Sequence, residues 1–149
     1  MAKDNRNDSY LGNRLLKPTN VNQQFTKHEV EEYVKCRDDI VYFLKNYVQV
    51  IHVDKGLVPF NLYDYQEDLI NTLHDNRYVI VKSARQSGKS VTSLGYILHY
   101  VLFNKTKIVG MLANKASTSR ELLGRLQTAY QHLPKFLQQG IVEWNKGNL

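Results

Sequence analysis

Apolar residues recur at helical spacing in four stretches of the chain. The first stretch follows a capping-box pair, Thr26 and Glu29, and predicts a helix from about Lys27 to Asn46. The other three predicted helices open within residues 60–68, at Val91, and at a second capping-box pair, Thr118 and Glu121; Pro134 stops the last of them.

Short apolar runs between these helices are typical of strands. Val48 to Val53 alternates in polarity and ends at a turn, Asp54-Lys55-Gly56. Tyr78 to Val81 and Lys107 to Ala113 are continuous runs with one predicted helix between them, which predicts a right-handed parallel unit. Ile141 to Trp144 predicts a third strand, followed by a turn. We therefore expect an α/β fold: a parallel sheet, incomplete at its C-terminal side, with a helical N-terminal subdomain.

The residues between the first continuous run and its helix form a candidate phosphate loop of the P-loop NTPase type. They are Lys82, Ser83, Ala84, Arg85, Gln86, Ser87, Gly88, Lys89 and Ser90. Backbone N–H groups near Ser87 and Gly88, together with the helix N-terminus, are suited to cradling phosphates. Lys89 would reach the β- and γ-phosphates of ATP, and Ser90 would bind Mg²⁺. Ser83 stands where the usual pattern has its first Gly, so we expect a variant turn.

An aromatic residue and a glutamine precede this strand and loop. A Gln side chain donates and accepts together, which matches the N6 and N7 edge of adenine. Gln66 is therefore the candidate for adenine recognition, with Phe60 or Tyr65 as an aromatic face. The alternative is a Gln on a helix surface with the aromatic residues in the core.

Composition sets the limits of these interpretations. The net charge is +6, from 20 Lys and Arg against 14 Asp and Glu, which permits nucleic-acid contact without requiring it. With Cys36 as the only cysteine and no apolar run of membrane-spanning length, we expect a soluble, intracellular protein. Residues 1–24 are polar and predict a mobile arm; the alternative is an arm that docks on a partner through Tyr10, Leu11, Leu15 and Leu16.

Hydroxyl residues and a lysine follow the second continuous run, in the segment 114–119. Placed at a helix N-terminus, they are suited to holding a DNA phosphate. Helix capping alone explains the same residues.

Four segments together resemble one family. They are Asp64-Tyr65-Gln66, the loop from Ser83 to Ser90, the segment from Ile108 to Ser119, and Gly140 to Gly147. In this order they resemble the large terminase subunit of myophages over roughly Phe60 to Leu149. The resemblance implies an ATP-driven motor that packages double-stranded DNA into procapsids, with Gln66 on adenine, Lys89 and Ser90 on phosphate and Mg²⁺, and Arg85 as a catalytic charge-stabilising residue. The alternative for Arg85 is an ion pair between loop and core. Implied partners are the portal protein and the small terminase subunit, with assembly into a homo-oligomer when complete, in the host cell cytoplasm and not in the mature virion.

Members of that family carry a later apolar strand, the Walker B strand, that ends in Asp-Glu, and a carboxylate cluster for a nuclease. Neither follows Ser90 here. We therefore divide the chain into an arm (1–24), a helical subdomain with a short strand (25–59) and the first part of an ATPase core (60–149), which lacks the Walker B strand and nuclease domain. We expect weak ATP binding and poor hydrolysis by this chain alone. A helicase-like DNA-dependent ATPase and a non-catalytic binding module are the alternatives.

Overall fold

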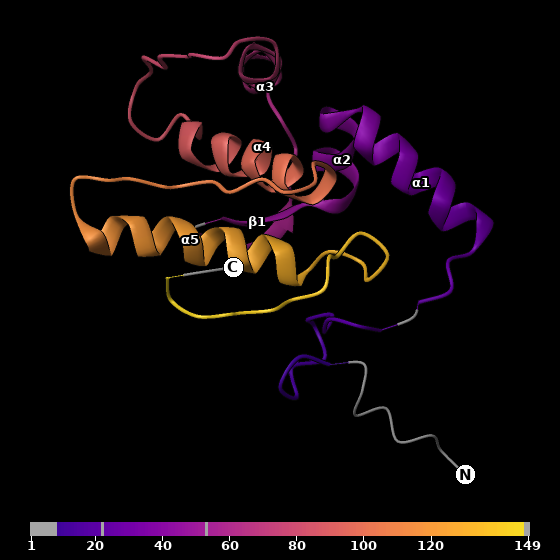
Figure 1. Cartoon of the computed structure of the whole chain (residues 1–149). Coiled ribbons are helices and arrows are strands. Elements are labelled where there is room, and N and C mark those ends of the chain that lie inside the picture. The colour runs from indigo at the N-terminus through magenta and orange to yellow at the C-terminus, as the bar shows by residue number, and fades with distance from the viewer. Residues whose placement is uncertain (1–8, 22, 53, 148–149) are drawn as a thin grey trace.

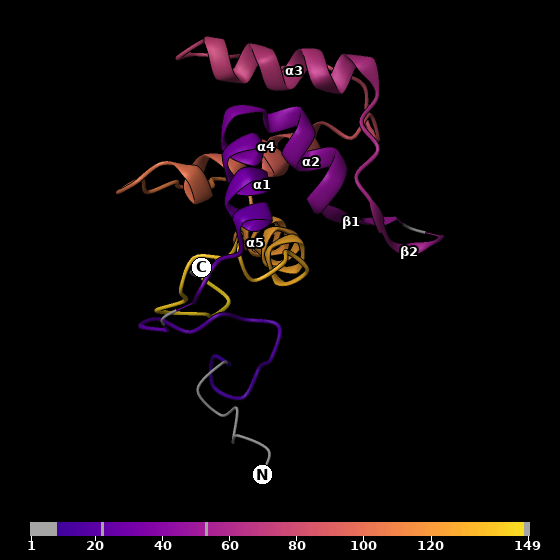
Figure 2. The same cartoon turned by 90° about the vertical axis from the view of Figure 1, so that its right-hand side faces the viewer.

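The computed structural model describes residues 9–21, 23–52 and 54–147, and in these ranges the protein is a small α/β domain. Helix α4 lies at its centre, with α2, α3 and α5 packed against it (Figures 1 and 2). The elements are α1 (Lys27–Asp38), α2 (Ile40–Tyr47), β1 (Gln49–His52), β2 (Gly56–Pro59), α3 (Asp64–Asp75), α4 (Lys89–Phe103) and α5 (Ala116–Gln131).

The helix predicted from Lys27 to Asn46 is two helices, because Asp39 interrupts it. The Asp39 backbone is extended, with φ −130° and ψ 104°, and its carboxylate accepts a hydrogen bond from the Tyr42 N–H at 2.8 Å. Aspartate favours this N-cap geometry over a helix interior, so it ends one helix and starts the next. The capping box of Thr26 and Glu29 at the start of α1 is confirmed.

The short strand predicted near residue 50 is confirmed as β1, but its partner was not foreseen. It pairs with β2 as an antiparallel hairpin, with Gln49 opposite Pro59 and His52 opposite Gly56. Gly56 was assigned to the turn and instead begins the second strand. Val53, the end of the predicted strand, lies outside the described residues.

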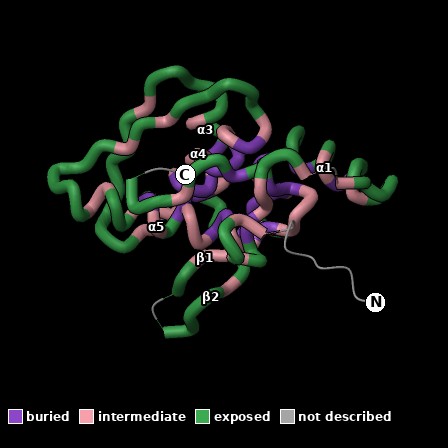
Figure 3. The backbone as a smooth tube through the Cα atoms, turned by 60° about the horizontal axis from the view of Figure 1, so that its bottom comes forward, coloured by how far each residue is buried: buried purple, intermediate pink, exposed green. Residues whose placement is uncertain are grey.

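The predicted parallel sheet does not form among the described residues, where the hairpin is the only sheet. The runs 78–81 and 107–113 are extended but exposed (Figure 3), with Ile80 98% and Ile108 100% exposed. Within the described ranges neither run makes a backbone–backbone hydrogen bond. A strand needs a neighbour that satisfies its N–H and C=O groups, and neither run has one here. The predicted third strand is reduced to one isolated parallel bridge between Ile141 and Pro18.

The arm predicted to be mobile is packed against the rest of the chain over residues 9–21. Leu16 is 1% exposed and belongs to the core, and the Ile141 N–H donates to the Lys17 carbonyl at 2.9 Å. Gln138 is buried beneath the arm: its Oε1 accepts from the Lys17 N–H at 3.0 Å and its Nε2 donates to the Leu15 carbonyl at 2.9 Å. These contacts differ from the prediction of a mobile arm.

None of the helices in the described ranges is long and apolar enough to cross a lipid bilayer.

Candidate nucleotide site

The loop 82–88 leads directly into α4, and Gly88 is the N-cap of that helix. Its φ of +74° lies in the left-handed region, which favours glycine. Gln86 is also left-handed, at φ +62°, whereas Ser83 is not among the described residues with positive φ. The missing first glycine of the motif is thus explained, because the backbone at Ser83 needs no positive φ.

Hydroxyl and ammonium groups hold the loop together from inside. The Ser87 hydroxyl donates to the Ala84 carbonyl at 3.0 Å, so in its contact with the Ser83 hydroxyl, also 3.0 Å, it accepts. The Lys89 ammonium donates to the same Ala84 carbonyl at 3.1 Å. Its positive charge therefore lies over the loop, next to the start of α4.

The first turn of α3 supports the loop from outside. The Tyr65 hydroxyl donates to the Ser87 carbonyl at 3.0 Å. Gln66 is 3% exposed, and its Oε1 accepts from the Tyr63 N–H at 3.0 Å. A Cβ added to Gly88 would lie 2.4 Å from Gln66 Nε2, so any larger residue at position 88 would collide with this side chain. The glutamine predicted to read adenine is thus in direct contact with the predicted phosphate loop.

A cavity of about 640 Å³ brings four of the predicted site residues together: Phe60, Gln66, Gln86 and Gly88. Phe60 is buried, at 3% exposed. The cavity is closed by residues that the sequence analysis did not select, from the hairpin β1–β2, from the connection that follows it and from α5; among them are Gln49, Asn61, Arg125 and Thr128. The alternating run at 48–53 predicted a strand but carried no signal that this strand lines a site.

The remaining predicted residues lie along the loop rather than in this cavity. Arg85 and Ser90 are exposed, and in the described part of the chain Arg85 forms no ion pair with a carboxylate. The structure therefore does not have the alternative arrangement, in which Arg85 forms an ion pair with the core. Within the described ranges there is also no group of three or more His, Cys, Asp or Glu side chains that would hold a metal ion.

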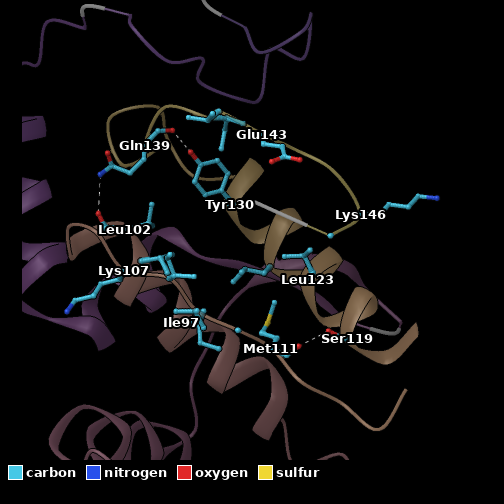
Figure 4. A pocket seen from close by; sticks show the side chains of 18 of the residues that line it. Ile97, Leu102, Lys107, Met111, Ser119, Leu123, Tyr130, Gln139, Glu143 and Lys146 are labelled. Atoms are coloured by element: carbon cyan, nitrogen blue, oxygen red, sulfur yellow. Dashed lines mark hydrogen bonds between the residues drawn. The ribbon is translucent and has the colours of Figure 1, made fainter. Parts of the chain in front are cut away.

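A second cavity, of about 790 Å³, lies between α4, the run 107–111, α5 and the C-terminal segment (Figure 4). Its walls are mostly apolar, and one side is closed by a chain of hydrogen bonds: Tyr130 to the Gln139 carbonyl, and Gln139 Nε2 to the Leu102 carbonyl at 3.1 Å. None of the residues predicted for nucleotide binding lines it.

The segment predicted to hold a DNA phosphate or to cap α5 has a different arrangement. Helix α5 begins at Ala116, and its N-cap is Lys115, three residues before the predicted cap at Thr118. Glu121 pairs with Arg125 at 2.6 Å instead of closing a capping box. The Ser119 hydroxyl donates to the Met111 carbonyl at 2.8 Å, which fastens the preceding run to the helix.

Comparison with known families gives a match for residues 80–149, to the family described as terminase large subunit, T4likevirus-type, N-terminal. The match covers the loop, α4, α5 and the C-terminal segment, and it confirms the resemblance seen in the sequence. Phe60, Tyr65 and Gln66 lie before the matched residues, so their assignment rests on the geometry around the loop.

Proposed function

From the match of residues 80–149 to the T4-like terminase large subunit, we propose that this chain is the ATP-binding part of a phage DNA-packaging motor. The observation that carries the proposal is the contact between the loop and α3: Gln66 packs on Gly88 at the point where the loop enters α4. Base-reading and phosphate-binding groups are thereby brought within one nucleotide's length of each other.

The start of α4 has the chemistry of an anion site. The helix is 15 residues long, its first turn holds no acidic residue, and its N-cap is a glycine without a side chain to block the free N–H groups. The Lys89 ammonium adds a full positive charge at the same place. These donors fit the β- and γ-phosphates of ATP, and the exposed Ser90 hydroxyl is available to Mg²⁺, which when bound neutralises phosphate charge.

The cavity beside the loop has the size and polarity of a base site. Its apolar floor includes Phe60, and small polar groups surround it, as is usual for ligand sites. Gln66 Oε1 already accepts one hydrogen bond from Tyr63, and a carbonyl oxygen has a second lone pair. That lone pair and the Nε2 donors are the groups an adenine N6 and N7 edge requires.

Hydrolysis places a further demand on the site. Negative charge grows on the γ-phosphoryl oxygens in the transition state, and the exposed Arg85 guanidinium is our candidate in the loop to stabilise it. The sequence after Ser90 has no apolar strand that ends in Asp-Glu. We therefore expect weak ATP binding and slow turnover from these 149 residues alone.

The family also suggests the setting in which the site works. We propose double-stranded DNA as the substrate of the motor, with the portal protein and the small terminase subunit as partners and the host cytoplasm as its location. The net charge of +6 favours contact with the phosphate backbone of DNA.

Binding of MgATP to the chain and to Lys89→Ala tests the nucleotide site. Loss of a charge-assisted contact is worth roughly 1.5–3 kcal/mol, so we expect at least tenfold weaker binding, measured by fluorescence of a labelled ATP. The control is Lys105→Ala, which removes an exposed charge after the end of α4 and should leave binding unchanged. Equal affinity of wild type and Lys89→Ala would show that the loop is not the phosphate site.

A further inference from the structure

We propose that Tyr65 is a positioning residue that aims the Gly88 N–H at the phosphates by holding the Ser87 carbonyl. The inference rests on the proposed nucleotide site and assigns to Tyr65 a task other than stacking on the base. Tyr65 does not line the cavity that Phe60 and Gln66 share, and its hydroxyl is bonded to the loop at 3.0 Å.

The first step is that two neighbouring residues in the first turn of α3 make different contacts with the loop. Tyr65 and Gln66 are consecutive residues of α3, so their side chains leave the helix about 100° apart. Gln66 is directed inward, at 3% exposed, whereas Tyr65 is 52% exposed and reaches across to a residue 22 positions later. One turn of α3 therefore contacts both the backbone of Ser87 and the face of Gly88.

The second step follows from peptide geometry. The Ser87 carbonyl and the Gly88 N–H belong to the same planar unit, and in a trans peptide they point in opposite directions. All described peptide bonds are trans. A donor that fixes the carbonyl therefore fixes the N–H on the other side of that plane, and this N–H belongs to the group expected to meet the phosphates.

The third step is that this peptide plane needs to be held. Glycine moves easily between left- and right-handed conformations, so the plane before Gly88 would rotate readily if it were free. The Ser87 side chain is fixed to the Ala84 carbonyl at 3.0 Å, but this bond leaves the Ser87 carbonyl without support. Tyr65 supplies that support. Its ring is stacked on Tyr63, with centroids 5.7 Å apart and planes within 8°, which limits the motion of the hydroxyl.

Tyr65→Phe and Tyr63→Phe form a matched pair for the test. Each removes one hydroxyl from the stacked rings, and only Tyr65 has its hydroxyl on the loop. Binding of tripolyphosphate and of adenosine is measured separately by calorimetry. We expect Tyr65→Phe to weaken tripolyphosphate binding about three- to tenfold, the effect of one neutral hydrogen bond, and to leave adenosine binding unchanged. Tyr63→Phe should leave tripolyphosphate binding unchanged; because Tyr63 itself lines the cavity, the control applies to phosphate binding and not to adenosine binding.

Unchanged tripolyphosphate binding in Tyr65→Phe would overturn the proposal. So would an equal loss of adenosine binding, which would assign Tyr65 to base stacking. A ligand-free measurement separates this inference from the nucleotide proposal: the Gly88 amide resonance should shift and broaden in Tyr65→Phe but not in Tyr63→Phe. If wild type binds no phosphate but the resonance responds in this way, the nucleotide site fails and the Tyr65 tether stands. If the resonance does not respond, the tether itself is refuted.

Discussion

Two kinds of segment differ in composition and in burial: residues 9–21, and the apolar runs 78–81 and 107–113. The first segment mixes polar and apolar residues and contains no helix or strand, yet Leu16 is 1% exposed and the segment lies against the turns that follow α5. The two runs are almost wholly apolar, and their isoleucines Ile80 and Ile108 are 98% and 100% exposed.

The difference lies in where the backbone hydrogen bonds go. In the arm, both backbone groups of Lys17 have hydrogen-bond partners. The Lys17 N–H donates to Gln138 Oε1, and the Lys17 carbonyl accepts from the Ile141 N–H. Among the described residues the two apolar runs make no backbone–backbone hydrogen bond; in the run 107–113 the Met111 carbonyl accepts one bond from a side chain, the Ser119 hydroxyl, at 2.8 Å. A segment can be buried only if its polar backbone groups are satisfied, so apolar side chains alone do not bring these runs into the core.

The largest expected effect comes from a substitution that disrupts the packing of residues 9–21. Leu16→Ala removes a fully buried side chain and should reduce the free energy of unfolding by about 2–5 kcal/mol, measured by urea denaturation. The arm should also become accessible, so that trypsin cleaves after Arg14 faster than in wild type.

Leu11→Ala is the matched control, because Leu11 is in the same arm and is 90% exposed. It should change the free energy of unfolding by less than about 0.5 kcal/mol. Equal effects of the two substitutions would mean that the arm is not docked in solution and that the polar composition had predicted its behaviour correctly.

Helices and the loop were largely predictable from the sequence, and the sheet was not. Helical periodicity and the capping box at Thr26 located α1, and the loop was found from Gly88-Lys89-Ser90 between an apolar run and a helix. These features are local, within a few residues of one another. The break at Asp39 was missed because its neighbours continue the helical pattern, although an aspartate at that position is a usual cap.

Contacts between distant residues account for what was missed. Burial of the arm depends on Gln138, more than 100 residues later, and the strand assignments at 78–81 and 107–113 assumed neighbouring strands that the described chain does not supply. In the candidate site, Gln66 was selected for its chemistry, but its contact with Gly88 and the tether from Tyr65 depend on how α3 packs on α4.

A smaller effect is expected from acid, through a network that joins α1 to α2. Glu32 is 5% exposed; it pairs with Lys35 at 2.7 Å and accepts from the Tyr47 and Tyr42 hydroxyls at 2.6 and 2.7 Å. These bonds, that from Lys35 first, lower the pKa of Glu32 from 4.5 to about 2. Because the folded pKa lies below the unfolded value, the stabilisation is complete above pH 4.5 and is lost as the pH falls toward 2.

Urea denaturation between pH 7 and pH 2 measures this contribution. Glu32→Gln should be less stable than wild type at pH 7 and should lose less stability on acidification, since the charge that the network holds is gone. Glu31→Gln removes an exposed carboxylate from the same helix, whose nearest cation is Lys27 at 4.0 Å, and should behave like wild type. If the free energy of unfolding of wild type and of Glu32→Gln fell in parallel between pH 7 and pH 2, Glu32 would not be the source of the acid-dependent stability.

The smallest change in stability is expected from a substitution in the exposed run 107–113. Ile108→Lys replaces an apolar side chain that is fully in contact with solvent, so the free energy of unfolding should stay within about 0.5 kcal/mol of wild type.

Self-association of Ile108→Lys should decrease, because exposed apolar residues on an unpaired extended run favour edge-to-edge contact between copies. Sedimentation velocity at several protein concentrations measures this, with Asn114→Lys as the control that adds the same charge at an exposed polar position. A loss of more than about 1.5 kcal/mol in Ile108→Lys would show that the run is buried in solution, and the contrast between the two regions would then disappear.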